Sequence, residues 1–204
     1  MTVETDWRHY EPAGLPRVLS AALEAFAEKG YHATSIRDIA AKASLSVPGL
    51  YHHYRSKQDM LVQLMLSVME ELLRRTRTAL EEADDGAGAQ FEAVVESMLR
   101  FHMFRRAHAF VASSEIRSLE PGNRVAYVAR RDLQQRMIEA IIERGRAEGE
   151  FSTPYPQEAA RAVSTLCVAV SSWYREDGPM SPEQIVERHL VFARGLVGAG
   201  AAGR

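Results

Sequence analysis

The apolar positions of this chain recur at helical spacing along almost its whole length. Intervals of three and four first appear before Gly30, in the set Val18, Leu19, Ala22, Ala25 and Phe26. No segment alternates between apolar and polar residues with the period of two that a half-buried strand requires. The pattern therefore predicts an all-α protein.

Three short helices are expected near the N-terminus. The first begins at about Pro16 and ends at Gly30, because proline suits a first helical turn and glycine a helix end. Ser35 and Asp38 form a capping box for the second, and Ser46 is the expected cap of a third that runs to Tyr54. We expect an N-terminal arm over residues 1–15 and a compact domain of three short helices over residues 16–61.

Longer helical segments follow, separated by turns that contain proline or glycine. A second capping box, Ser56 to Asp59, opens a helix that is long enough to join two bodies. The segments expected to be helical are 57–83, 90–106, 109–118, 123–148, 157–175 and 182–197. They predict a larger domain over residues 62–198, and the glycine and alanine residues of 199–204 predict a flexible tail.

Composition and charge narrow the class of protein. With 204 residues, of which 46% are hydrophobic and 25% charged, the chain can build a real core, which excludes a disordered protein. Its apolar runs fall well short of the roughly 20 residues of a membrane span, and its polar N-terminus lacks the features of a secretory signal. We expect a cytoplasmic protein with no membrane partner.

The charge is not evenly distributed. The whole chain has a formal net charge of -2, so it has no general attraction to nucleic acid. Residues 31–57, however, contain one acid, Asp38, against four bases, which are Arg37, Lys42, Arg55 and Lys57. A short helix, a tight turn and a second short helix in this region form the arrangement that places a recognition helix in the major groove of DNA. The N-terminal domain is therefore predicted to contact DNA.

Two segments carry a resemblance to a known family: TSIRDIA at 34–40 and LYHHYRSKQDML at 50–61. They resemble the DNA-binding domain of the TetR family of transcriptional repressors. The resemblance covers about residues 16–61. It implies an all-helical homodimer that binds a palindromic double-stranded operator and leaves it when a small molecule binds the larger domain.

The same resemblance implies roles for individual residues. Base edges are expected near Arg37, Val47, Pro48 and Gly49, and phosphates near Ser35, Tyr51, His53 and Lys57. Ser46 and His52 complete the predicted contact set, although His52 could equally be a solvated residue. Ser44 departs from the family because it replaces the glycine usual in the turn, so the backbone there is expected to be slightly different or strained. Gly49 replaces the hydroxyl or methyl side chain of many relatives. Recognition of the DNA base sequence is therefore expected to depend on Arg37, on contacts with thymine methyl groups and on DNA shape.

The larger domain is rich in phenylalanine and methionine, which either fill a core or line an adaptable apolar cavity. Polar residues that interrupt these segments are the better candidates for a ligand site, since arginines beside an apolar cavity could bind carboxylate or phosphate groups. The predicted ligand-binding residues are Phe101, His102, Phe104, Arg105, Phe110, Ser114, Arg117, Tyr127, Arg130, Gln134 and Trp173.

A third segment, WYREDGPMSPEQI at 173–185, is similar to the corresponding region of TetR-type repressors of lipid and sterol catabolism. Those relatives respond to acyl-CoA thioesters, so the resemblance implies an acyl-CoA or related lipid-derived CoA ester as the effector. The alternative is a multidrug-sensing repressor of an efflux pump. Its pocket would favour aromatic cations, whereas the arginines here favour anions.

The last two helices have the composition of a dimer interface. The residues predicted to form it are Val163, Leu166, Val170, Leu190, Phe192 and Leu196. Cys167 is expected to be buried, and no cysteine or histidine spacing predicts a metal site. The chain lacks the common hydrolase and nucleotide-binding motifs, so neither catalysis nor a cofactor is expected.

Overall fold

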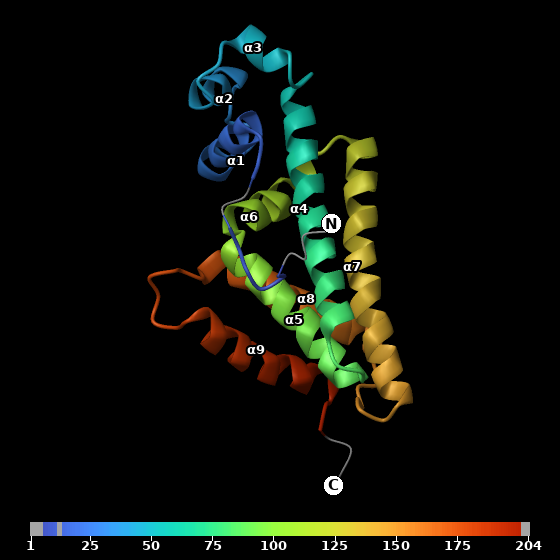
Figure 1. The fold of residues 1–204 in the computed structure, drawn as a ribbon. Helices are drawn as coiled ribbons and strands as arrows, with labels where there is room; N and C mark the ends of the chain where they lie inside the picture. The colour runs from blue at the N-terminus through green and yellow to red at the C-terminus, as the bar shows by residue number, and fades with distance from the viewer. Residues whose placement is uncertain (1–5, 12–13, 201–204) are drawn as a thin grey trace, which may run out of the picture. The chain divides into compact units, whose positions relative to one another are not determined.

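The computed structural model describes residues 6–11 and 14–200, and within them every regular element is a helix (Figure 1). The all-α prediction is thus confirmed. The elements are α1 (Arg17–Lys29), α2 (Ile36–Lys42), α3 (Val47–Tyr51), α4 (Lys57–Glu82), α5 (Ala87–Phe104), α6 (Arg106–Ser114), the 3-10 turn η1 (Glu115–Ser118), α7 (Pro121–Ala147), α8 (Pro156–Trp173) and α9 (Pro182–Val197).

Most of these bounds lie within a few residues of the predicted ones. The third helix is shorter than expected, because after Tyr51 the His53 amide donates to the Leu50 carbonyl in a tighter turn, at 3.0 Å. The segment predicted as one helix over 109–118 is α6 followed by η1. None of the described helices has the length and apolar character needed to cross a bilayer.

Packing divides the chain into two compact units. The head unit contains residue 11 and residues 14–71 and 106–131, and the body unit contains residues 6–10, 72–105 and 132–200. The division falls inside α4 and inside α7. It differs from the predicted domains: α6 and η1 pack with the head unit, and residues 6–10 pack with the body unit. Residues 1–5 and 12–13 of the predicted arm and residues 201–204 of the predicted tail lie outside the described part of the chain.

The core of the head unit forms where α1 packs against α2 and α6. The apolar side chains at its centre are fully buried, and each of those larger than alanine contributes on the order of 1.5–3 kcal/mol by leaving water. They are Ala22, Phe26, Ile39, Leu50, Met60 and Leu61. This core fixes α2 and α3 on one rigid base.

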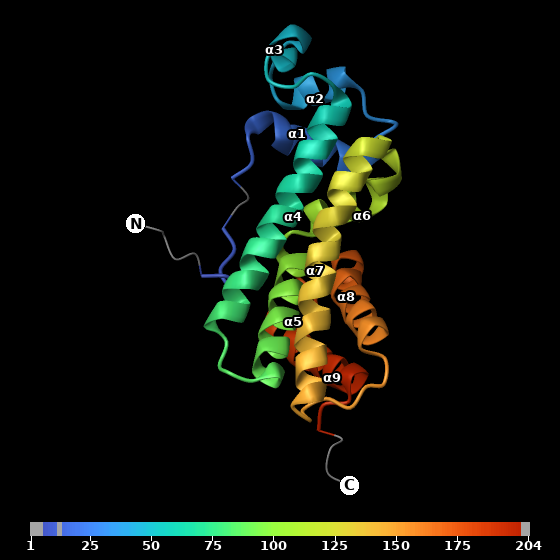
Figure 2. The same ribbon diagram turned by 90° about the vertical axis from the view of Figure 1, so that its right-hand side faces the viewer.

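In the body unit, α5 packs against both α8 and α9 (Figures 1 and 2). Phe91, Val95 and Leu99 of α5 are buried in this core. The guanidinium group of Arg194 holds the carboxylate of Glu92 with two hydrogen bonds of 2.7 Å, which joins α9 to α5. These contacts determine which faces of α8 and α9 point away from the core.

Candidate functional site

The helix-turn-helix begins with a complete capping box at α2. The Asp38 amide donates to Ser35 Oγ at 3.1 Å, and Asp38 Oδ2 accepts from the Ser35 amide at 2.8 Å. The hydrogen bonds from Ser35, helped by one from Lys29, lower the pKa of Asp38 to about 2. Ser35 is exposed at this helix end, beside the orphan amides that favour a phosphate.

A sharp turn joins α2 to α3. The Leu45 amide donates to the Ala40 carbonyl at 2.9 Å and the Ser44 amide to the Ala41 carbonyl at 3.0 Å. Ser44 has φ = 50°, in the left-handed region that favours glycine. The strain expected from the missing glycine is therefore present, and it costs about 1–2 kcal/mol.

Ser46 then caps α3, because its hydroxyl accepts from the Gly49 amide at 3.1 Å. A Cβ at Gly49 would lie only 3.2 Å from Ser46 Oγ, so glycine leaves room for this cap. Pro48 is exposed, Val47 is half-buried and Leu50 is fully buried. The first turn of α3 is consequently an apolar surface with few hydrogen-bonding groups.

Most of the predicted DNA contacts lie at the surface of the head unit. Tyr51 has 49% of its surface exposed, and Arg37, His52 and His53 are also exposed. Their hydroxyl, guanidinium and imidazole groups offer donors to phosphates or base edges. The geometry is compatible with the predicted contacts, which stay predictions.

Lys57 is placed differently from the other predicted phosphate contacts. Its Nζ donates to the carbonyls of Tyr31 and Thr34, both at 2.7 Å, and lies 4.3 Å from the centre of the Tyr31 ring. Partial burial lowers the pKa of Lys57. The sequence analysis missed this role, which joins the start of α4 to the loop between α1 and α2. One of the three ammonium hydrogens is left over after these two bonds.

The η1 turn also holds the loop between α1 and α2. Glu115 Oε1 accepts from the Tyr31 amide at 3.2 Å, while Oε2 accepts from the hydroxyl of Ser118 at 2.7 Å. Burial, with the nearby Glu120 and Glu115 carboxylates, raises the pKa of Tyr31. The helix-turn-helix is thus held by α4 and η1 as well as by its own core.

The predicted ligand residues divide between the two units. In the body unit, Phe101 and His102 of α5 are buried, and His102 Nδ1 lies 2.7 Å from the Met98 carbonyl. Burial lowers the pKa of His102 to about 4, so its imidazole is neutral at pH 7. Gln134 of α7 is also buried, and neither amide atom has a hydrogen-bond partner among the described residues. An unpaired buried amide is costly and marks Gln134 as a group that a ligand could satisfy.

Phe104 is the last residue of α5 and Arg105 is its C-cap, and both lie beside the N-terminal segment. The Phe104 ring lies 4.9 Å from the Tyr10 ring and 6.5 Å from the Tyr174 ring. Arg105 is buried, with its guanidinium carbon 5.2 Å from the Tyr10 ring centre. The structure adds Arg75 of α4 to this cluster, 3.8 Å from the Tyr10 ring. The signal in the sequence that could have identified Arg75 is its place within the buried stripe of α4, between Leu72 and Ala79 at helical spacing.

In the head unit, Tyr127 is buried and its hydroxyl donates to the Ala112 carbonyl at 3.3 Å. Ser114 Oγ is buried without a partner among the described residues. Arg130 is half-buried and donates to the Ala126 carbonyl of its own helix at 3.2 Å. By contrast, Phe110 and Arg117 are exposed rather than enclosed.

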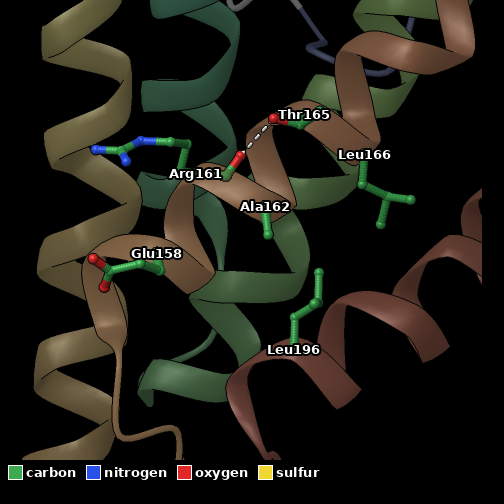
Figure 3. Close-up of a pocket in the computed structure, with 6 residues that line it drawn as sticks. All are labelled: Glu158, Arg161, Ala162, Thr165, Leu166 and Leu196. Carbon is green, nitrogen blue, oxygen red and sulfur yellow. Dashed lines mark hydrogen bonds between the residues drawn. The ribbon is translucent and has the colours of Figure 1, made fainter.

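The outer face of α8 and α9 is apolar. Phe192 is 60% exposed and Leu196 39%, and Leu166 and Leu190 are half-buried. A groove of about 550 Å³ lies on this face, lined by Glu158, Arg161, Ala162, Thr165, Leu166 and Leu196 (Figure 3). Trp173 is also exposed and stacks on His189 with ring centres 5.7 Å apart, so it lies at a surface rather than in an enclosed pocket.

Two of the predicted interface residues need correction. Val163 and Val170 have no exposed surface, because both point into the core of their own chain. They share that buried face of α8 with Cys167, and burial raises the pKa of its thiol to about 12. No group of three or more histidine, cysteine or acidic residues in the described part of the chain is arranged to hold a metal ion.

Comparison with known proteins matches both parts of the chain. A family model described as bacterial regulatory proteins of the tetR family matches residues 18–64, and one described as the C-terminal domain of tetracyclin repressor-like proteins matches residues 84–197. The HTH-type transcriptional repressor KstR2 of Mycobacterium tuberculosis is 28% identical over 183 residues, which are 87% of this chain and 90% of that protein.

Two solved structures are also similar. A tetR-family regulatory protein from Rhodococcus RHA1 shares 31% identity with a TM-score of 0.83, over 90% of this chain and 96% of that one. AibR, solved in complex with isovaleryl coenzyme A and operator DNA, has a TM-score of 0.80 over 90% of this chain and 100% of its own. Its identity is 20%, so this likeness concerns the fold.

Proposed function

We propose that this chain, which belongs to the TetR family of transcriptional regulators, is a repressor that binds a palindromic operator as a homodimer and is released by a lipid-derived CoA thioester. The observation that carries the proposal is the helix-turn-helix with its exposed donors. The similarity to KstR2, a transcriptional repressor by name, extends over most of the chain and supports repression rather than activation.

The head unit supports DNA binding through two kinds of contact. Ser35, Tyr51 and His53 are exposed donors for phosphates, which would set the position of α3 on the duplex. Arg37 is the exposed group that can read a guanine edge, and Val47 and Pro48 can contact thymine methyl groups. A surface so poor in hydrogen-bonding groups favours A·T-rich positions and recognition of DNA shape.

The effector class is supported by chemistry and by two relatives. AibR binds isovaleryl coenzyme A, and KstR2 is described as a ketosteroid regulator. In this chain the amide of Gln134, which has no partner among the described residues, can meet a thioester carbonyl or a polar group of an acyl chain, in a body unit rich in buried phenylalanine and methionine. Arg105 supplies positive charge for a carboxylate or phosphate.

The outer face of α8 and α9 supports the homodimer. An exposed Phe192 beside Leu196 and Leu166 is costly in water. Packing of this face against its copy around a two-fold axis would bury these side chains in a four-helix bundle and fill the groove of Figure 3. Two head units would then be held as a pair for two operator half-sites.

Release from DNA follows from differential binding. The effector needs only to bind the operator-incompetent state more tightly, and each tenfold difference in affinity contributes about 1.4 kcal/mol of coupling. No covalent step is required of the protein.

The test is fluorescence anisotropy of labelled DNA from the region upstream of the gene, at fixed salt, with isovaleryl-CoA, palmitoyl-CoA, a steroid-CoA ester, free fatty acids and cationic dyes. Tight binding that one CoA ester releases is the expected result. Release by dyes alone would refute the effector class in favour of a drug sensor, and a lack of specific DNA binding would refute the repressor. Tyr51→Ala serves as the control that removes a DNA contact without touching the body unit.

A further inference from the structure

Residues 6–10 form a short segment, here called the strap, that packs on α4 and α5 of the body unit (Figure 1). The chain continues from the strap into α1, so a segment that directly precedes the DNA-binding head belongs by its contacts to the other unit. No feature of the proposed function explains this placement.

The first half of the strap is held by charged partners on both helices. Trp7 is 1% exposed, and its Nε1 donates to Glu82 of α4 at 2.9 Å. The guanidinium group of Arg8 donates two hydrogen bonds, of 3.1 and 3.2 Å, to the carboxylate of Glu96 on α5. Its central carbon lies 3.8 Å from the centre of the Trp7 ring.

The second half of the strap is held by an arginine side chain that donates hydrogen bonds to its backbone carbonyls. Arg75 of α4, only 3% exposed, donates from one nitrogen to the carbonyls of Trp7 at 3.1 Å and His9 at 2.9 Å. The same guanidinium stacks on the Tyr10 ring, and Phe104 lies against that ring on α5. Glu82 and Arg75 are seven residues apart, so they share one face of α4 and hold the strap at two places two turns apart.

The strap contacts two residues of the proposed effector site and is tied closely to the head. Phe104 and Arg105 both contact Tyr10, so a ligand that reorders either side chain must act on the strap. Between Tyr10 and the start of α1 at Arg17 the chain can span at most about 25 Å, even when fully extended. A docked strap therefore limits the positions open to α1.

We infer that the strap couples the effector site to the DNA-binding head: while docked it restrains the head through the short connection to α1, and an effector that disturbs Phe104 or Arg105 changes that restraint. The coupling role depends on the proposed function, but the restraint itself does not. The restraint is a property of the ligand-free chain and can be measured without DNA or effector.

The experiment measures the distance between the two units with spin labels. Ala41→Cys on α2 and Gln157→Cys on α8 place one label in each unit at exposed positions, and buried Cys167 stays unlabelled. Labelled chains are mixed with excess unlabelled chains, so that only distances within one chain are recorded. In the double variant Trp7→Ala/Tyr10→Ala, the width of the distance distribution is expected to at least double.

A second variant separates restraint from a merely structural role. Six Gly-Ser residues inserted after Gly14, an exposed position with no atom near its Cβ, leave every strap contact intact and lengthen only the connection to α1. The same insertion after Gly149, in the exposed loop before α8, is the matched control. Widening with the first insertion and not the second supports the inference. A distribution unchanged by the first insertion overturns it, whether or not the double variant folds.

Operator affinity with and without isovaleryl-CoA, or another CoA ester that the anisotropy panel identifies, then tests the coupling. The insertion after Gly14 should reduce the effector-induced change in operator Kd from tenfold or more to about threefold or less. A full effector response in that variant would overturn the coupling role. If the parent chain shows no operator binding or no response, the proposed function fails, whereas the spin-label comparison still decides whether the strap restrains the head.

Discussion

Lys57→Ala tests two roles of a single residue, one predicted from the sequence and the other found in the structure. The resemblance to the family makes Lys57 a phosphate contact, whereas the structure uses its ammonium to join the start of α4 to the carbonyls of Tyr31 and Thr34. If both roles are real, the change must weaken the fold of the head as well as its attraction to DNA.

The loss of stability can be worked out from these contacts. A hydrogen bond from a charged donor contributes about 1.5–3 kcal/mol, and the contact with the Tyr31 ring about 0.5 kcal/mol. Partial burial of the ammonium offsets some of this, so we expect a net loss of about 2–3 kcal/mol. For a chain of this size, that lowers the Tm by about 5–10 °C.

Thermal unfolding followed by circular dichroism measures the first role, and operator affinity over a range of salt concentrations measures the second. If the third ammonium hydrogen donates to one phosphate, Lys57→Ala should reduce the salt slope by about 0.9. Tyr51→Ala is the matched comparison: this exposed neutral side chain should lower operator affinity without changing either the Tm or the salt slope. Lys57→Met keeps the aliphatic stem and isolates the charge.

A Tm for Lys57→Ala within about 1 °C of the parent would refute the stabilising role derived from the two carbonyl contacts. A normal salt slope combined with a lower Tm would instead show that the residue serves the fold alone.

Four further predictions concern other residues. Ser44→Gly should raise the free energy of unfolding by about 0.5–1 kcal/mol in urea titration, because glycine accepts the positive φ at less cost, and a decrease would contradict the strain. In the folded chain the pKa of His102 is about 4, whereas in the unfolded chain this imidazole takes up a proton near pH 6.5, so the free energy of unfolding should fall by about 3 kcal/mol as the pH drops from 6.5 to 4. His102→Leu should lose that part of the pH dependence, and a pH profile of stability that the variant leaves unchanged would refute this assignment. Cys167 should not react with a thiol reagent until the protein unfolds, and rapid labelling of the native chain would show that it is accessible. Phe192→Asp should turn the proposed dimer into a monomer in analytical ultracentrifugation, since it places a charge among exposed apolar side chains, and a dimer that survives would move the interface elsewhere.

Part of the candidate site follows from the sequence because the causes are local. The caps at Ser35 and Ser46 each act on an amide three residues away, so the residue types predict the start of each helix. The strain in the turn is predicted from the family resemblance, which places Ser44 where a glycine is usual, and it depends on the backbone angle of that one residue. The exposed donors of α2 and α3 then follow from which face of each short helix is apolar.

The faces of α8 could not be assigned in the same way. Both sides of that helix carry small and aliphatic residues, so the spacing of three and four does not say which side meets its own core. The structure turns Val163 and Val170 inward and leaves Leu166 nearer the surface. Packing against α5 and α9 made that choice.

The sequence by itself determined the all-α class, most helix bounds, the caps and the strained turn, since each depends on residues within about one helical turn of each other. Only the tertiary structure decided where Lys57 donates, that α6 and η1 belong with the head unit, and that the strap docks on the body. Arg75 and the strap carbonyls are more than sixty positions apart in the chain. Such a contact depends on how whole helices pack, and no periodic pattern within a single segment encodes it.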